Sequence, residues 1–163
     1  MMLYHTIETE RLTIRELTLD DREAVWRHFA SAEVTEFMDI EPCRDLAEAE
    51  EIIRFHLEDT GTRWGLFEKD GGALVGTIGY HCWVQSEARA EIGFDLAREF
   101  WGQGLMQEAL RPVLAFGFGN MGLRLIEATV EPPNERCLKL MERLGFAREE
   151  QLRDGLVYLT LGN

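Results

Sequence analysis

Residues 91–110 place a strand, a loop with two glycines and a helix in direct succession, and this order constrains the fold more than any other stretch. The segment EIGFDL alternates apolar and polar residues, as a strand with one buried face does. Gly102 and Gly104 follow one residue apart, and apolar residues then recur at helical spacing from Leu105. The first helical turn leaves backbone N–H groups without partners. A loop without side chains at this point therefore suits an anion such as a pyrophosphate.

The two glycines alone leave another interpretation open, because glycines before helices are also ordinary turn residues. The loop lacks the GK[ST] sequence of a Walker loop and the third glycine of a dinucleotide-binding fingerprint. A phosphate site thus needs support from the rest of the chain.

The remaining segments predict a mixed α/β protein with one largely antiparallel sheet. A strand over residues 123–130 follows the helix, so residues 91–130 form a β-α-β unit with two parallel strands. We expect an edge strand at 8–17, two strands around a DGG turn within 63–84, and a closing hairpin around 153–155. We expect one domain over residues 1–163, which is long enough for a proper core.

Capping residues predict where the other helices begin and end. Thr18 is the predicted N-cap of a first helix. Asp45 and Glu48 have the spacing of a capping box for a second helix, which Gly61 would end. Its apolar face would comprise Ala49, Ile52, Ile53 and Leu57. A C-terminal helix would begin after Asn134 and end at Gly145.

Charge and composition exclude several classes of function. The net charge of −13 argues against binding of a nucleic-acid backbone, which needs a basic surface. Residues 1–60 carry sixteen Asp and Glu against six Arg, so this excess of acid either is a solvated surface or attracts cationic ligands. The three cysteines and four histidines show no metal-site spacing, and we expect no metal. Without a long apolar run or a signal sequence, we expect no membrane association and a cytoplasmic location.

Two longer motifs give the chain a family resemblance. AEIGFDLAREFWGQGLMQEAL, followed by VEPPNERCLKLMERLGF, resembles the GNAT superfamily of acetyl-CoA-dependent N-acetyltransferases, in particular its RimJ/RimL-type branch. ETERLTIREL and LVGTIGY resemble other strands of the family, so the resemblance covers nearly the whole chain. It implies an α+β GNAT-like fold, with a twisted sheet, about four flanking helices and a parallel strand pair that splays around the pantetheine arm of acetyl-CoA.

The resemblance also implies which residues bind acetyl-CoA. The amides of the glycine loop would bind its pyrophosphate, and main-chain groups of the preceding strand would pair with its pantetheine. Asn134 would lie near the cofactor, although it also suits a plain N-cap. Arg143 would either reach the CoA phosphates or be a solvated charge. The predicted cofactor-binding residues are Phe94, Leu96, Gly102, Gln103, Gly104, Leu105, Met106 and Asn134.

The chemistry of amine acetylation suggests two catalytic residues. An alkyl amine is mostly protonated at neutral pH and must lose a proton before it attacks the thioester. Glu91, at the start of the strand beside the thioester, is the candidate base; the alternatives are a structural glutamate or a water network. Family members supply a proton to the leaving thiolate from a tyrosine, but Met141 stands in that place. The branch instead has a serine where this chain has Cys137, which could be the donor or a buried small hydrophobe.

The identity of the acceptor stays open at this point. The RimJ/RimL resemblance implies a protein N-terminus, and the acidic N-terminal segment fits either a basic protein or a polyamine. Tyr80, His81 and Trp83 would either line the acceptor pocket or pack in the core. A non-catalytic acyl-CoA-binding regulatory module is the alternative to an enzyme. The sequence does not distinguish a monomer from a homodimer.

Overall fold

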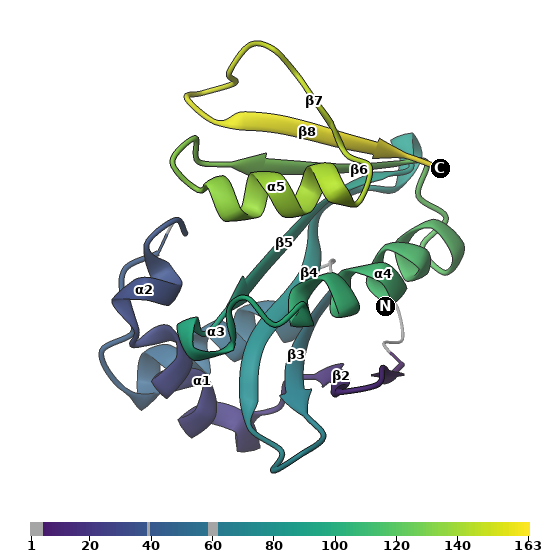
Figure 1. Cartoon of the computed structure of the whole chain (residues 1–163). Coiled ribbons are helices and arrows are strands. Elements are labelled where there is room, and N and C mark those ends of the chain that lie inside the picture. The colour runs from purple at the N-terminus through teal and green to yellow at the C-terminus, as the bar shows by residue number, and fades with distance from the viewer. Residues whose placement is uncertain (1–4, 39, 59–61) are drawn as a thin grey trace.

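A computed structural model describes residues 5–38, 40–58 and 62–163 (Figure 1). The strands are β1 (Ile7–Glu8), β2 (Leu12–Glu16), β3 (Thr62–Glu68), β4 (Leu74–Val84), β5 (Arg89–Leu96), β6 (Leu125–Val130), β7 (Ala147–Arg148) and β8 (Val157–Gly162). The α-helices are α1 (Arg22–Phe29), α2 (Ala32–Thr35), α3 (Leu46–Glu58), α4 (Leu105–Gly119) and α5 (Glu135–Arg143).

The strands form one sheet in the order β1-β2-β3-β4-β5-β6-β8-β7. Neighbouring strands are antiparallel except β5 and β6, which are parallel and joined through α4. This arrangement confirms the predicted β-α-β unit. The parallel pairing covers only Arg89–Glu91 of β5 and Leu125–Glu127 of β6, and the two strands then diverge, as Figure 1 shows.

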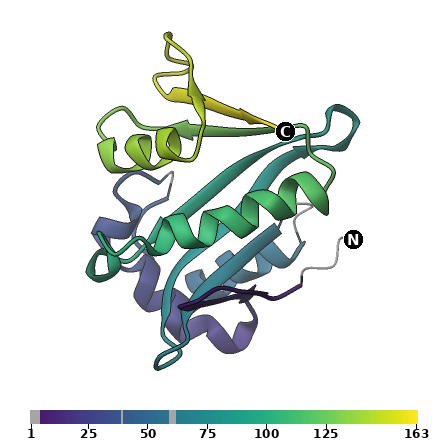
Figure 2. The ribbon, with the colours of Figure 1, turned by 45° about the vertical axis from the view of Figure 1, so that its right-hand side comes forward.

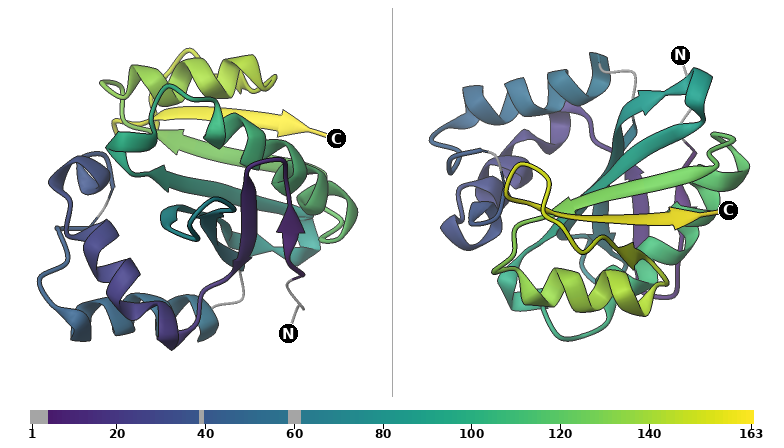
Figure 3. Two further views of the ribbon diagram at one scale, coloured as in Figure 1. Left: turned by 60° about the horizontal axis from the view of Figure 1, so that its bottom comes forward. Right: turned by 90° about the horizontal axis from the view of Figure 1, so that it is seen from above.

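Two hydrophobic clusters lie on opposite faces of the sheet. α4 crosses the sheet on one face, on the same side as α5 (Figure 2), and its apolar residues pack against Trp64, Ile78 and Ile92. On the other face, α1 and α3 pack around Val25 and Ile53. The two views in Figure 3 show α1–α3 gathered apart from α4 and α5. The splay of β5 and β6 therefore opens between these two groups of helices.

The N-terminal predictions need several corrections. The expected edge strand is a hairpin of β1 and β2. Thr18 is an N-cap as predicted, but of a single 3₁₀ turn, Leu19–Asp21, in which the Asp21 amide donates to the Thr18 carbonyl at 2.9 Å; α1 follows directly at Arg22. The short helix α2 was not predicted, because its four residues are too few to show a period.

The second predicted helix is confirmed as α3, with one change at its apolar face. Asp45 accepts a hydrogen bond from the Glu48 amide at 2.9 Å, as an N-cap does. Ala49 and Ile53 are buried, whereas Leu57 is 46% exposed and lies outside the core. Gly61, the predicted stop, is outside the described residues. Within the part of the chain that is described, no helix is both long and apolar enough to span a membrane.

Candidate active site

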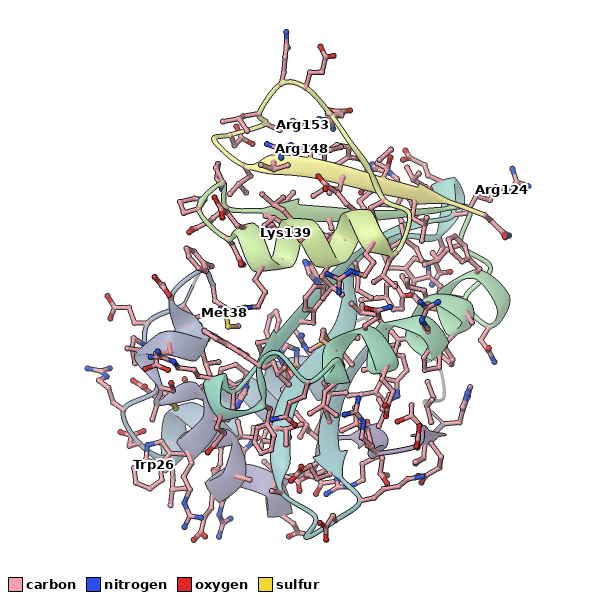
Figure 4. All side chains as sticks on the ribbon, viewed as in Figure 1. Trp26, Met38, Arg124, Lys139, Arg148 and Arg153 are labelled. Atoms are coloured by element: carbon pink, nitrogen blue, oxygen red, sulfur yellow. The ribbon has the colours of Figure 1, made fainter. Side chains whose placement is uncertain are left out.

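The divergence of β5 and β6 is bordered by two adjoining cavities. The larger, about 830 Å³, lies over the start of the splay, and the smaller, about 500 Å³, extends toward the glycine loop and α4. Residues that line both cavities come from β5, α5 and the segment after α2: Phe37, Met38, Phe94, Asp95, Asn134 and Cys137. Met38 lies between α2 and α5 (Figure 4). A ligand could therefore extend from the loop to the start of the splay.

The glycine loop has the backbone geometry that requires glycine. Gly102 and Gly104 have φ values of +75° and +78°, a region that L-residues with a side chain rarely adopt. Gly104 directly precedes α4, and no described residue accepts a hydrogen bond from the amides of residues 102–106. Amide donors without partners and the positive end of a helix dipole are the features that anion-binding sites in proteins use.

Arg11 holds this loop from the N-terminal hairpin, a role that sequence reasoning missed. Its Nη1 donates to the Gln103 carbonyl at 3.0 Å and its Nε to Glu108 at 2.9 Å. Glu108 on α4 also accepts from the Thr9 hydroxyl at 2.6 Å. The loop is therefore tied to the start of the chain. In the sequence Arg11 belongs only to the local ETERL pattern. Such a pattern does not reveal a contact with Gln103, which lies 92 residues further along the chain.

Seven of the eight predicted cofactor-binding residues line the smaller cavity, and Gln103 does not. Its carbonyl is turned toward Arg11, and its side chain donates to the Glu99 carbonyl at 3.2 Å. The carbonyl of Leu96 accepts from the Trp101 indole at 2.8 Å. The structure thus gathers the predicted residues at one cavity, with Gln103 on the outer side of the loop.

Asn134 is the N-cap of α5, as one of its two interpretations predicted. Its Oδ1 accepts from the Cys137 amide at 3.3 Å, and its side chain also borders both cavities. Arg143 lies at the smaller cavity and donates to the Gln107 side chain at 3.3 Å. Lys139 borders the same cavity from α5, and its label lies beside that helix in Figure 4. Arg136 borders this cavity too, so three cationic side chains of α5 lie near the glycine loop.

Cys137 is half-buried where the two cavities adjoin, and burial raises the pKa of its thiol to about 12. The thiol therefore stays protonated at neutral pH. Met141, one helical turn further along α5, is fully buried and also borders the larger cavity. Among the described residues, no tyrosine hydroxyl stands in its place.

Glu91 lies at the start of the splay with two polar partners. The Thr129 hydroxyl donates to its Oε1 at 2.7 Å, and His81 Nε2 lies 3.4 Å from the same oxygen. The hydrogen bond from His81 lowers the pKa of Glu91, partial burial opposes this effect, and the bond from Thr129 lowers the pKa further. Glu91 is thus a carboxylate at neutral pH. His81 and Trp83 line the larger cavity. Tyr80 borders it too, but is buried and donates to the Val113 carbonyl at 2.7 Å.

Asp95, Thr77 and His28 form a buried polar cluster. Asp95 lies on the same face of β5 as Glu91 and Gly93. Asp95 accepts hydrogen bonds from the Thr77 amide at 3.0 Å and the Thr77 hydroxyl at 2.6 Å, and its Oδ1 lies 2.5 Å from His28 Nε2. Burial is the largest single effect and would raise the pKa of Asp95, but His28, the charge of Arg63 and the Thr77 hydrogen bond together lower it. The sequence held one signal of this pair: His28 shares a helix face with Val25 and the neighbouring Phe29.

The comparisons with known proteins agree with this geometry. Residues 11–147 match the acetyltransferase (GNAT) domain family. An uncharacterized N-acetyltransferase, p20 of Bacillus licheniformis, is 37% identical over 153 residues, covering 91% of this chain and 86% of the relative. The [ribosomal protein uS5]-alanine N-acetyltransferase of Escherichia coli is 29% identical over 107 residues, 65% of this chain and 55% of its own length.

A solved structure supports the fold independently of sequence. It is that of RimL, a ribosomal L7/L12 alpha-N-protein acetyltransferase, in complex with coenzyme A. It matches with a TM-score of 0.84 at 15% identity, and the match covers 97% of this chain and 98% of the other. Together with the domain match and the named relatives, the splayed sheet shows that the chain belongs to the GNAT family of acetyltransferases.

Proposed function

We propose that the protein transfers an acetyl group from acetyl-CoA to a primary amine, which attacks the thioester directly without a covalent enzyme intermediate. One observation carries the proposal. The opening between β5 and β6 begins directly after Glu91, and its cavities lead to the unpaired amides of the glycine loop. A pyrophosphate at the loop would thus place the acetyl end of an extended cofactor near the carboxylate. Family membership favours this enzyme over a non-catalytic acyl-CoA-binding module.

In this proposal the cofactor adds to the sheet. The backbone groups of Phe94 and Leu96 lie beyond the last residue of β5 that pairs with β6, so the pantetheine amides can bond there as a further strand would. The amides of residues 102–106 bind the pyrophosphate, and Lys139 and Arg143 attract its negative charge. The cofactor is acetyl-CoA as co-substrate, and this reaction uses no metal.

The acceptor in this proposal is a cationic amine. The larger cavity is lined by the carboxylates of Glu91 and Glu131, with Phe55 and Trp83 among its aromatic residues. Carboxylates attract an ammonium group, and aromatic faces stabilise it further. A basic protein N-terminus is the first candidate, since one relative is named for the N-terminal alanine of a ribosomal protein. A polyamine fits the same charges and is the second candidate.

We assign proton removal to Glu91 acting with His81. The low pKa of Glu91 makes it a weak base but a good partner for the acceptor ammonium. His81 Nε2 lies 3.4 Å from Glu91 Oε1, so the imidazole stands beside the carboxylate and is placed to take part in the proton transfer. The pair thus combines the two roles predicted for Glu91, base and orienting group.

In this proposal Cys137 donates a hydrogen bond to the leaving sulfur and does not transfer its proton to it. Its pKa of about 12 lies above the ordinary pKa of a thiol, about 8.5, so its proton does not pass readily to the CoA thiolate. A neutral S–H can still donate a weak hydrogen bond to the departing sulfur. We propose this contact for Cys137, with the proton coming from the acceptor amine instead.

The test is acetyl-CoA titration by calorimetry, followed by a thiol-release assay with N-terminal peptides, polyamines, amino acids and aminoglycosides. Glu91→Gln should lower kcat by tenfold or more and leave the acetyl-CoA Kd nearly unchanged, since a positioned base contributes about that much. His81→Gln should also lower kcat, because it removes the imidazole beside Glu91. If both variants keep the parent kcat, the proton does not pass through this pair.

A further inference from the structure

Three side chains at the mouth of the larger cavity form a cluster that acetyl transfer does not require. They are His81 and Cys82, near the end of β4, and Glu91, on the adjacent strand β5. One ligand atom from each, an imidazole nitrogen, the thiol sulfur and a carboxylate oxygen, lies within 4.8 Å of the other two. Cys82 is exposed, and the other two are half-buried. The cluster therefore faces solvent at the rim of the acceptor cavity.

An irregularity in β4 brings the three groups together. Consecutive side chains of a regular strand point to opposite faces, so His81 and Cys82 would ordinarily be separated by the sheet. The β4–β5 register shifts between His81 and Val84, and Cys82 has a φ of +51°, in the left-handed region. This bulge brings the Cys82 sulfur close to the His81 imidazole nitrogen and the Glu91 carboxylate oxygen.

Glycine on the neighbouring strand makes room for the imidazole. A Cβ atom at Gly93 would lie 3.0 Å from His81 Cε1, closer than ordinary packing allows. On the far side of Glu91, the Thr129 hydroxyl donates to Oε1 and fixes the direction of the carboxylate. Partners of this kind orient metal ligands in protein sites.

We propose that His81, Cys82 and Glu91 bind a Zn²⁺ ion. A thiolate, an imidazole and a carboxylate are the three ligand types that zinc takes in proteins, and a fourth position would stay open to water. Zinc bonds of about 2.0–2.3 Å require the three ligand atoms to approach one another by small side-chain rotations. The exposed rim gives Cys82 and His81 freedom to make them.

The consequence for activity follows from the function proposed above. Zinc bound here occupies Glu91 and His81 and blocks the mouth of the acceptor cavity. The ion is therefore an inhibitor of acetyl transfer, reversed by a chelator, and is not a catalytic cofactor.

The test measures binding separately from activity. Co²⁺ added to the reduced, metal-free protein should give the ultraviolet band of a cobalt–thiolate bond and the visible bands of a tetrahedral ion, and Zn²⁺ should displace it. Cys82→Ser should abolish the thiolate band, and Glu91→Gln should weaken binding by tenfold or more. Cys137→Ser is the matched control and should keep the spectrum.

Two outcomes would overturn the metal site. The first is a thiolate band that persists in Cys82→Ser or disappears in Cys137→Ser, because another thiol would then hold the ion. The second is the absence of any one-to-one complex in the parent protein. Circular dichroism of Cys82→Ser checks folding, which an exposed position should not disturb. Because no outcome depends on turnover, a failure of the proposed acetyl transfer would leave this result unaffected.

Discussion

Asp95→Asn should destabilise the protein strongly, because it removes the charge at the centre of a buried cluster. The Asp95 side chain is only 3% exposed and the His28 side chain 2%. The carboxylate receives two hydrogen bonds from Thr77 on β4 and pairs with His28 on α1, so one side chain joins three elements. Asparagine fits the space, but its NH₂ group cannot accept a hydrogen bond.

The magnitude follows from the cost of breaking a buried pair, about 3–5 kcal/mol in the free energy of unfolding. For a chain of this size that corresponds to a fall in Tm of roughly 6–20 °C. Urea unfolding followed by tryptophan fluorescence and circular dichroism measures it, and Asp70→Asn in the exposed β3–β4 turn is the control, expected within about 0.5 kcal/mol. A loss below 1 kcal/mol for Asp95→Asn would refute the role of this cluster.

The pH dependence gives an independent check. Because the pKa of Asp95 is lower in the folded protein than in the unfolded chain, its contribution is fully present above about pH 4, the ordinary range of an aspartate, and is lost as the pH falls through the folded pKa. The stability difference between the parent and Asp95→Asn should therefore shrink on acidification. A difference that grows in acid would mean that the carboxylate is not held in its charged form.

Three further predictions concern the loop and the cysteines. Gly104→Val forces a β-branched residue into a φ of +78°, at a cost of about 1–2 kcal/mol. Calorimetry should therefore show an acetyl-CoA Kd raised about tenfold. Unchanged binding would exclude the loop as the pyrophosphate site. Arg11→Ala frees the Gln103 carbonyl and should raise the KM for acetyl-CoA by up to about fivefold at constant kcat, the effect of one surface ion pair; a fall in kcat alone would contradict this role. Iodoacetamide should label the exposed Cys82 before Cys137, because burial raises the pKa of the Cys137 thiol to about 12. Peptide mass spectrometry measures the order of labelling. Earlier labelling of Cys137 would show that it is a thiolate.

The sequence predicts the centre of this fold well, because its signals there are local. The change from alternating to helical spacing after Leu96, with two glycines between, marks the β-α-β unit directly. Asn134 and Gly145 mark the ends of α5 in the same way. These features depend on neighbours in the chain, so they can be read without knowledge of the fold.

The polar clusters were not predictable, because they depend on register between strands. His81 meets Glu91 only through the pairing of β4 with β5, and Cys82 joins them through a bulge that no turn residue announces. Asp95 meets His28 across 67 residues of sequence. Alternation in the sequence EIGFDL puts Glu91, Gly93 and Asp95 on one face of the strand, but it does not show which residues lie opposite them.

In the function proposed above β5 is the central strand, because it pairs with β6 only as far as Glu91. After Glu91 the strand no longer pairs with β6, so its outer backbone groups need another partner, which an extended cofactor can supply. A strand that pairs with a neighbour on one edge only is held less firmly. The Asp95 side chain ties this part of β5 to Thr77 on β4 and His28 on α1. Because side chains alternate, Phe94 and Glu91 lie on opposite faces of β5; Phe94 borders both cavities and Glu91 the larger one. The rigidity that Asp95 gives and the chemistry that we propose for Glu91 thus belong to one strand that loses its partner.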